Sequence, residues 1–159
     1  MGFVSKIKNA VSSVISNTSK GIMLSFDYKS PSGGYMNYAI FSVTGTNPST
    51  NRKNTRKYEC KTESEAKKLA ISDGLIDIES IKPIQFAPPT ERQIEACKKH
   101  YRIIPPNACS IDVSFIMTKE IEDEEDAPID LIKQADSLGL KFSYLAGKQT
   151  LQELIKNHK

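Results

Sequence analysis

The proline-containing stretch FAPPTER, residues 86–92, separates two parts of the chain that have different hydrophobic patterns. Before it, β-branched and aromatic residues occur in short runs separated by turn formers, whereas after it apolar residues recur at helical spacing. Strand signals followed by helix signals predict an α+β protein. We therefore predict an α+β domain over residues 21–87 and a helical domain over residues 88–159, with an amphipathic helix over residues 1–20 before them.

The first domain is expected to be a small antiparallel sheet with one packed helix, in the order β-β-β-α-β. Two runs of strand formers, IMLSFDY and YMNYAIFSVTG, flank the hairpin signal KSPSGG, and a third strand is expected around RKYECKT. Thr62 and Glu65 predict a capping box at the start of a helix that Gly74 ends, and IDIESIKPI then returns as a strand. The helix residues predicted to face the sheet are Ala66, Leu69, Ala70 and Leu75.

The second domain is expected to be an all-α four-helix unit built from two helix-pair repeats. A shift of 39 residues aligns five pairs without a gap: Pro89 with Pro128, Ala96 with Ala135, Ile103 with Phe142, Phe115 with Leu154 and Ile116 with Ile155. Since a helix pair cannot bury its apolar face alone, the two pairs are expected to stack on each other. The acidic run EIEDEED, residues 120–126, is expected to be a solvated linker between them.

The stretches PPTERQIEACKKHYRIIPPNACSIDVSFIM and ADSLGLKFSYLAGKQTL, within residues 88–157, together resemble a helical module found at the C-terminal end of some bacterial proteins that carry HIRAN or exonuclease-like domains. ADSLGLKFSYLAGKQTL resembles the second half of that module, and His100 and Tyr101 stand where its first half usually has Leu-Gly. In PPTERQIEACKKHYRIIPPNACSIDVSFIM the matching residues are Thr90, Glu91, Gln93, Ala96, Ile104, Pro105, Asp112, Ser114 and Ile116. The resemblance includes no catalytic residue, and it implies an association with DNA-processing proteins.

The segment GTNPSTNRKNTRKYEC, residues 45–60, combines turn formers with basic side chains. Residues 46–54 lie between two predicted strands, so we expect them to form an exposed hairpin loop. Phosphate oxygens accept hydrogen bonds from lysine, arginine and amide side chains. An alternative is that a charged hairpin tip only protects the sheet edges from aggregation. The candidate nucleic-acid-binding residues are Arg52, Lys53, Asn54, Arg56 and Lys57.

The distribution of charge favours an anionic partner for the first part of the chain. Residues 1–88 hold twelve Lys and Arg against seven Asp and Glu. Residues 89–159 hold ten against twelve, and six of those acids belong to the acidic run. A basic surface of this kind attracts nucleic acids without regard to their sequence.

No membrane partner is expected. No apolar run reaches the roughly 18 residues that a membrane span needs, and the N-terminus lacks the pattern of a secretory signal, so we expect a cytoplasmic protein. We expect the helix over residues 1–20 to dock on the body of the protein or on a second copy. Binding to a membrane surface is the alternative.

The cysteines and histidines predict neither a metal site nor a catalytic centre. Three cysteines in a chain that can bury a core are expected to be reduced thiols. Cys97, His100 and Cys109 are too few for a closed zinc site, and no third group orients a Cys-His pair. SPSGG lacks the Gly-Lys-Ser/Thr ending of a P-loop. We therefore expect no metal, no cofactor and no enzymatic activity.

These patterns favour two functions. The first is a non-enzymatic accessory module that contacts the phosphates of DNA or RNA through a basic β-hairpin. The second is a protein-protein interaction adaptor that binds no nucleic acid, with the N-terminal helix or the helical domain as its docking element.

Overall fold

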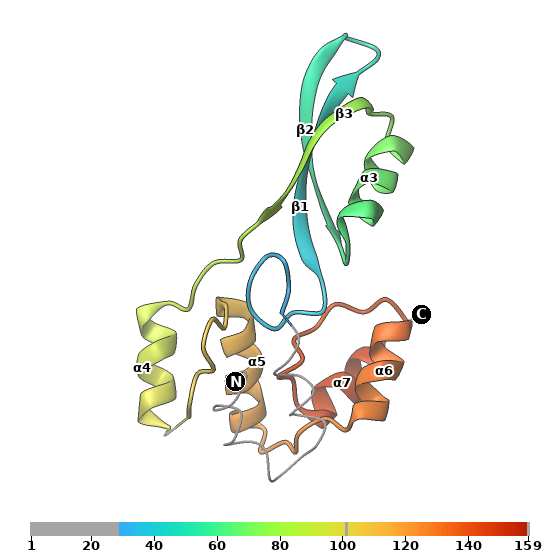
Figure 1. The fold of residues 1–159 in the computed structure, drawn as a ribbon. Coiled ribbons are helices and arrows are strands. Elements are labelled where there is room, and N and C mark those ends of the chain that lie inside the picture. The colour runs from blue at the N-terminus through green and yellow to red at the C-terminus, as the bar shows by residue number, and fades with distance from the viewer. Residues whose placement is uncertain (1–28, 101, 159) are drawn as a thin grey trace, which may run out of the picture. The chain divides into compact units, whose positions relative to one another are not determined.

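The computed structural model describes residues 29–100 and 102–158, which divide into two compact units. The sheet unit consists of Ser30–Ser32 and Tyr38–Phe86, and the helical unit contains Gly33–Asn37 and residues 87–158. The helix predicted over residues 1–20 and the strand predicted in IMLSFDY lie outside the described residues. The predicted α+β fold is confirmed (Figure 1).

The sheet unit is a three-stranded antiparallel sheet with one helix packed on it (Figure 1). β1 (Ala39–Asn47) is the central strand, and β2 (Arg52–Cys60) and β3 (Ile76–Ile84) flank it. α3 (Glu63–Ser72) contacts all three strands. Buried and half-buried residues alternate along β1, so every second side chain enters the core under α3. That core contains Ala39, Phe41, Val43, Ala66, Ala70 and Leu75.

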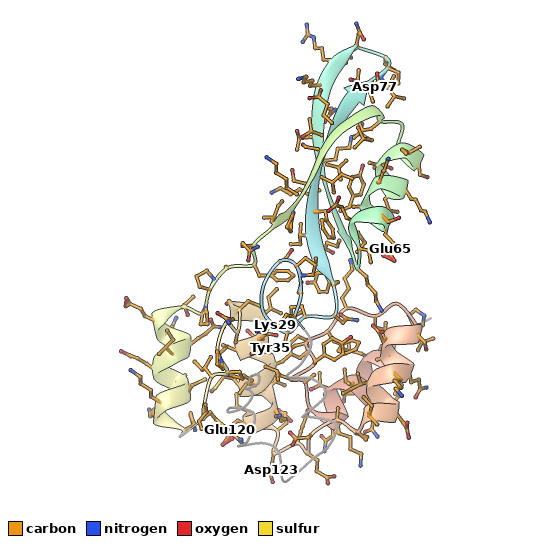
Figure 2. The ribbon with its side chains drawn as sticks, viewed as in Figure 1. Lys29, Tyr35, Glu65, Asp77, Glu120 and Asp123 are labelled. Atoms are coloured by element: carbon orange, nitrogen blue, oxygen red, sulfur yellow. The ribbon has the colours of Figure 1, made fainter. Side chains whose placement is uncertain are left out.

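The predicted helix start and helix face are confirmed except at two points. The Thr62 hydroxyl accepts a hydrogen bond from the Glu65 N–H, but the Glu65 carboxylate accepts from the N–H of Lys61 instead of that of Thr62. Glu65 lies in the first turn of α3 (Figure 2). The prediction that Leu69 faces the sheet is wrong, because its side chain is 43% exposed. Ala66 and Ala70 are one helical turn apart and define the buried face without it.

The helical unit consists of two helix pairs, each over its own core. α4 (Glu91–Lys99) and α5 (Ser110–Ile121) form the first pair, and α6 (Ile129–Ser137) and α7 (Lys148–Lys156) form the second. The first core contains Tyr35, Cys97, Ala108, Val113, Ile116 and Leu145. The second contains Ala127, Ile132, Ala135, Phe142, Ala146 and Leu151. Among the described residues, no helix has both the length and the hydropathy that crossing a membrane requires.

The two helix pairs correspond at an offset of 38 residues, because α6 and α7 begin at 129 and 148 whereas α4 and α5 begin at 91 and 110. The turns after α4 and α6 make equivalent hydrogen bonds, from the N–H of Arg102 to the carbonyl of Cys97 and from that of Leu140 to Ala135. The predicted shift of 39 aligns Ile103, which is 67% exposed, with the fully buried Phe142. The helices therefore differ by one residue from the predicted alignment, and the internal repeat stays a prediction.

The segment Gly33–Asn37 belongs to the helical unit, although the sequence KSPSGG predicts a turn between two strands. Met36 forms an antiparallel bridge with Ser143, and the N–H of Asn37 donates to the carbonyl of Phe142. The strand that was expected to start at Tyr35 starts at Ala39 instead. Tyr35 is buried in the first helical core, where Figure 2 labels it.

The carboxylate of Asp112 joins three segments of the helical unit. Its Oδ2 accepts hydrogen bonds from the N–H groups of Tyr35 and Cys109, both at 2.9 Å, and its Oδ1 accepts from the hydroxyl of Ser143 at 2.7 Å. The side chain is fully buried. Burying a carboxylate is costly unless hydrogen bonds replace its water, and these three donors do so. Asp112 thereby fixes the inserted segment Gly33–Asn37 against the start of α5.

The acidic run of residues 120–126 joins the two helix pairs as predicted, but it is solvated only in part. The Glu124 carboxylate accepts from both the N–H and the hydroxyl of Thr150, at 3.0 and 2.6 Å, and so caps the start of α7. The N-cap residue Gly147 has no side chain that could do this, and a Cβ there would collide with Glu124. Lys119 pairs with Asp126 at 2.7 Å, and Arg102 pairs with Glu120.

Gly34→Ala tests the buried carboxylate. Gly34 has a φ of +72°, and an added Cβ would lie 2.3 Å from Asp112 Oδ2. We expect Gly34→Ala to lower the free energy of unfolding by about 2–5 kcal/mol, because left-handed strain adds to the loss of a buried hydrogen bond. The matched control is Gly139→Ala, which has a φ of +75° with open space around the Cβ, and should cost only about 1–2 kcal/mol.

Urea denaturation of the full chain and of both variants measures the difference. Equal losses for the two variants would mean that the Asp112 contacts add nothing to stability beyond the backbone conformation at residue 34.

Candidate functional site

The predicted basic residues lie in a strand, so the prediction of a loop over residues 46–54 is wrong. The connection between β1 and β2 is only residues 48–51, and β2 begins at Arg52. The Asn47 side chain accepts from the N–H of Ser49, and Asn51 has a φ of 55°, so asparagines build this turn. A tight turn lengthens the paired strands and puts all five candidate residues into the sheet.

The pleat of β2 then divides the candidates between two faces. Arg52, Asn54 and Arg56 pair with Asn47, Gly45 and Val43 of β1 and share the face that α3 covers. Lys53 and Lys57 pair with Thr46 and Ser42 and lie on the opposite face. The structure therefore brings together two of the five predicted residues and separates them from the other three.

Arg56 binds the end of α3 instead of facing solvent. Its Nη1 donates to the carbonyl of Asp73 at 2.9 Å and lies 3.6 Å from the Asp73 carboxylate. The hydroxyl of Tyr58 donates to the same carboxylate at 2.9 Å. Partial burial and this hydrogen bond raise the pKa of Tyr58. Arg56 thus has a structural role at the C-terminus of α3, where a cation is favourable.

We call the side of the sheet away from α3 the open face. Within the described part of the sheet unit, no helix covers it. Hydroxyl groups line its centre, and those of Thr44 and Thr55 are hydrogen-bonded at 2.8 Å. From the strand register its members are Ile40, Ser42, Thr44, Thr46, Lys53, Thr55, Lys57, Glu59, Ile76, Ser80, Lys82 and Ile84.

A row of two lysines and one serine crosses the open face. Ser42 on the central strand pairs with Lys57 of β2 on one side and with Lys82 of β3 on the other. Neighbouring strands are about 4.8 Å apart, so the two lysine Cα atoms are separated by about 10 Å. Both lysines are exposed, and neither has an ion pair or a hydrogen bond with any described residue. Within the described part of the chain, the row therefore presents two unpaired cations on either side of a hydroxyl.

The third lysine of the open face is held by a carboxylate. Lys53 Nζ lies 3.1 Å from Glu79 Oε1, and the two side chains are 71% and 45% exposed. The contact arises where the register of β1 and β3 shifts between Thr44 and Thr46. Besides Glu79, Glu59 is a second acid on this side of the sheet, two residues along β2 from Lys57.

Sequence reasoning missed Lys82 and Ser42. Their signal was only partial, because IDIESIKPI reads as a strand but the alternation of Ile76, Ile78 and Ile84 assigns Lys82 to their apolar face. In the structure the neighbouring Ile81 packs against the core, so Lys82 points away from it. The sequence does not reveal that β3 pairs with β1 in the register that places Lys82 opposite Ser42. That pairing depends on the crossover through α3.

The cysteines lie in structural positions. Cys97 is buried in the first helical core, where its thiol contacts Met117 Sδ at 3.5 Å, and His100 is exposed at the end of α4. Burial raises the pKa of the Cys97 thiol and raises that of Cys109 to about 11. In the described residues, no three His, Cys, Asp or Glu side chains converge to hold a metal ion. That the chain needs no cofactor stays a prediction.

Comparison of the chain with family models, with curated proteins and with solved structures finds no match. The likeness of residues 88–157 to the HIRAN-associated module therefore stays an expectation from the sequence. The geometry of the open face carries the functional argument alone.

Alkylation tests the positions of the three thiols. The thiolate is the reactive form, and a raised pKa leaves Cys97 and Cys109 protonated and unreactive near pH 8. We expect iodoacetamide to modify the half-exposed Cys60 first in the folded protein, and all three cysteines only in guanidinium chloride. Mass spectrometry of the digested protein identifies which cysteines are alkylated. Modification of Cys109 as fast as Cys60 in the folded chain would contradict its burial.

Proposed function

We propose that the sheet unit is a non-enzymatic module that binds the phosphate backbone of a nucleic acid on its open face. The observation that carries this proposal is the row of Lys57, Ser42 and Lys82 across the three strands. Lysine ammonium groups and hydroxyls are donors that phosphate oxygens accept. A sheet supplies them at fixed spacing, which a flexible loop does not.

The common face of the two lysines favours a ligand over a purely structural role. An exposed lysine without an ion pair to a described residue is ordinary, and Lys67 and Lys68 of α3 are further examples, but basic residues that only improve solubility need no common face. Lys53 and Arg56 have such acidic partners, Glu79 and Asp73. Lys57 and Lys82 do not have one among the described residues, although both lie on the same face. A polyanion would supply the missing counter-charge.

The exposed position of the lysines also bears on the alternative that basic residues protect sheet edges. β2 and β3 are the edge strands, and each carries one lysine of the row. Edge protection explains lysines on β2 and β3 individually. It does not explain why the two lysines stand in one cross-strand row with a serine between them. We therefore place phosphate binding first and edge protection second.

The adaptor function is supported by a different observation, in the helical unit. Ile103 and Ile121 are 67% and 71% exposed, which is high for large aliphatic side chains. Single exposed apolar residues are common on protein surfaces, so this support is weaker.

Charge removal on the open face tests the proposal. For Lys57→Gln/Lys82→Gln we expect weaker binding to DNA or RNA, with the slope of log affinity against log salt flattened by up to about 2, since each neutralised phosphate contributes about 0.9 on duplex DNA. The stability of the variant should change by less than about 0.5 kcal/mol at each exposed site. Fluorescence anisotropy at several salt concentrations measures both affinity and slope.

The matched control is Lys67→Gln/Lys68→Gln on α3, which removes the same charge from exposed positions outside the open face. This control should keep the wild-type salt slope. Equal weakening by both double variants would show attraction to net charge alone. If the wild-type chain binds neither DNA nor RNA at low salt, phosphate binding is refuted and the adaptor function is favoured.

A further inference from the structure

Among the residues that the structure describes, the open face carries no aromatic side chain, in contrast to surfaces that bind single strands. Within β1 and β2, the aromatic residues Phe41 and Tyr58 point toward α3. Phe41 is 2% exposed, and the hydroxyl of Tyr58 is bonded to Asp73. Every member of the open face is aliphatic, hydroxyl-bearing or charged. Proteins that hold unpaired bases usually stack them on exposed aromatic rings, and this face offers none.

Tyr38 is the aromatic residue that directly precedes β1. Its ring packs edge to face against Phe86, with 5.4 Å between the ring centroids and 78° between the planes. Phe86 is 9% exposed, so this pair is part of the interior of the sheet unit. The Tyr38 ring is half-buried and is engaged in that packing, so the described part of the chain supplies no free stacking platform to the open face.

We infer that the ligand of the open face is a double-stranded backbone, contacted at about two phosphates through Lys57 and Lys82 and without recognition of base sequence. This inference rests on the proposed function and specifies the class of nucleic acid. A surface that makes only ionic and hydroxyl contacts gains most from the strand with the higher charge density. Each neutralised phosphate contributes about −0.9 to the slope of log affinity against log salt on duplex DNA, and about −0.7 on single strands.

Glu79 limits the number of phosphates. It occupies Lys53 through the 3.1 Å ion pair, so that lysine is neutralised by the protein itself. A phosphate that approaches Lys53 must displace the Glu79 carboxylate and is repelled by it. Removing the Glu79 carboxylate leaves Lys53 as a third unpaired cation on the open face, next to the row of Lys57 and Lys82. Glu79 is therefore a residue that weakens binding and sets the salt dependence.

The experiment compares nucleic acids of equal length on the full chain. The probes are two labelled 20-base-pair duplexes of unrelated sequence and a 20-nucleotide oligo-dT, titrated by anisotropy from 25 to 150 mM salt. We expect the two duplexes to bind equally within about twofold and the single strand to bind several-fold more weakly. The slope on duplex should be about −2, since about two phosphates are neutralised.

The variant Glu79→Gln should bind the duplexes several-fold more tightly and steepen the slope by up to about 0.9. Its control is Glu63→Gln in the first turn of α3, which removes the same charge outside the open face and should leave the slope unchanged. Unchanged duplex affinity and slope in Glu79→Gln would overturn the role of Glu79.

The outcomes separate this inference from the proposed function. Tighter binding of oligo-dT than of duplex, still lost in Lys57→Gln/Lys82→Gln, keeps the proposed function and overturns the duplex inference. If Tyr38→Leu then removes the preference for oligo-dT, Tyr38 is a stacking residue. No binding of any probe overturns both.

Discussion

The buried carboxylate of Asp112 is the interaction on which the helical unit depends. Each helix pair closes over its own core, and the two cores meet where Tyr144 packs against both, Phe115 of α5 packs against the second and Leu145 belongs to the first. The inserted segment Gly33–Asn37 lies between them, bonded to Asp112 through Tyr35 and to the second pair through Asn37 and Met36. Asp112 also accepts from Ser143 of the second pair. A single buried carboxylate with two backbone donors and one hydroxyl donor therefore links segments that are far apart in the sequence, and loss of the Ser143 hydroxyl would leave one carboxylate oxygen without its donor.

Local chemistry made the elements predictable, but the long-range contacts could not be predicted from it. Thr62 and Gly74 mark the two ends of α3 through hydrogen bonds to residues within one turn, and both do so in the structure. The segment KSPSGG has the composition of a hairpin turn, but its last two residues belong to the helical unit. Hydrogen bonds to distant residues, such as those of Tyr35 with Asp112 and of Asn37 with Phe142, place Tyr35 and Asn37 in the helical unit.

The acidic run shows the same dependence on distant residues. It looks solvated in sequence, but Gly147 cannot cap α7 itself and Glu124 takes that role. Glu124 and its partner Thr150 are 26 residues apart along the chain, and Asn37 and Phe142 are 105 residues apart. The candidate site shows this limit at the level of single side chains. The basic cluster was visible in the sequence, but the side on which each residue points depends on where β2 starts, and a shift by one residue exchanges the two faces. Arg56 and Lys57 are neighbours in sequence with opposite roles: one holds the end of α3, and the other belongs to the open face. Lys82 joins Lys57 only through the central strand, so this surface has no contiguous motif, and cross-strand register is the information that the sequence lacks.

The central claim is that ligand contacts are made by the open face and not by the rest of the basic surface. The most direct measurement is a titration of the ¹⁵N-labelled chain with a short DNA duplex, followed by amide chemical shifts. The account predicts saturable shifts that concentrate at Ser42, Lys57 and Lys82 and are small at Ala66 and Ala70, which lie behind the sheet in α3. Shifts confined to the helical unit, or no shifts at low salt, would contradict it.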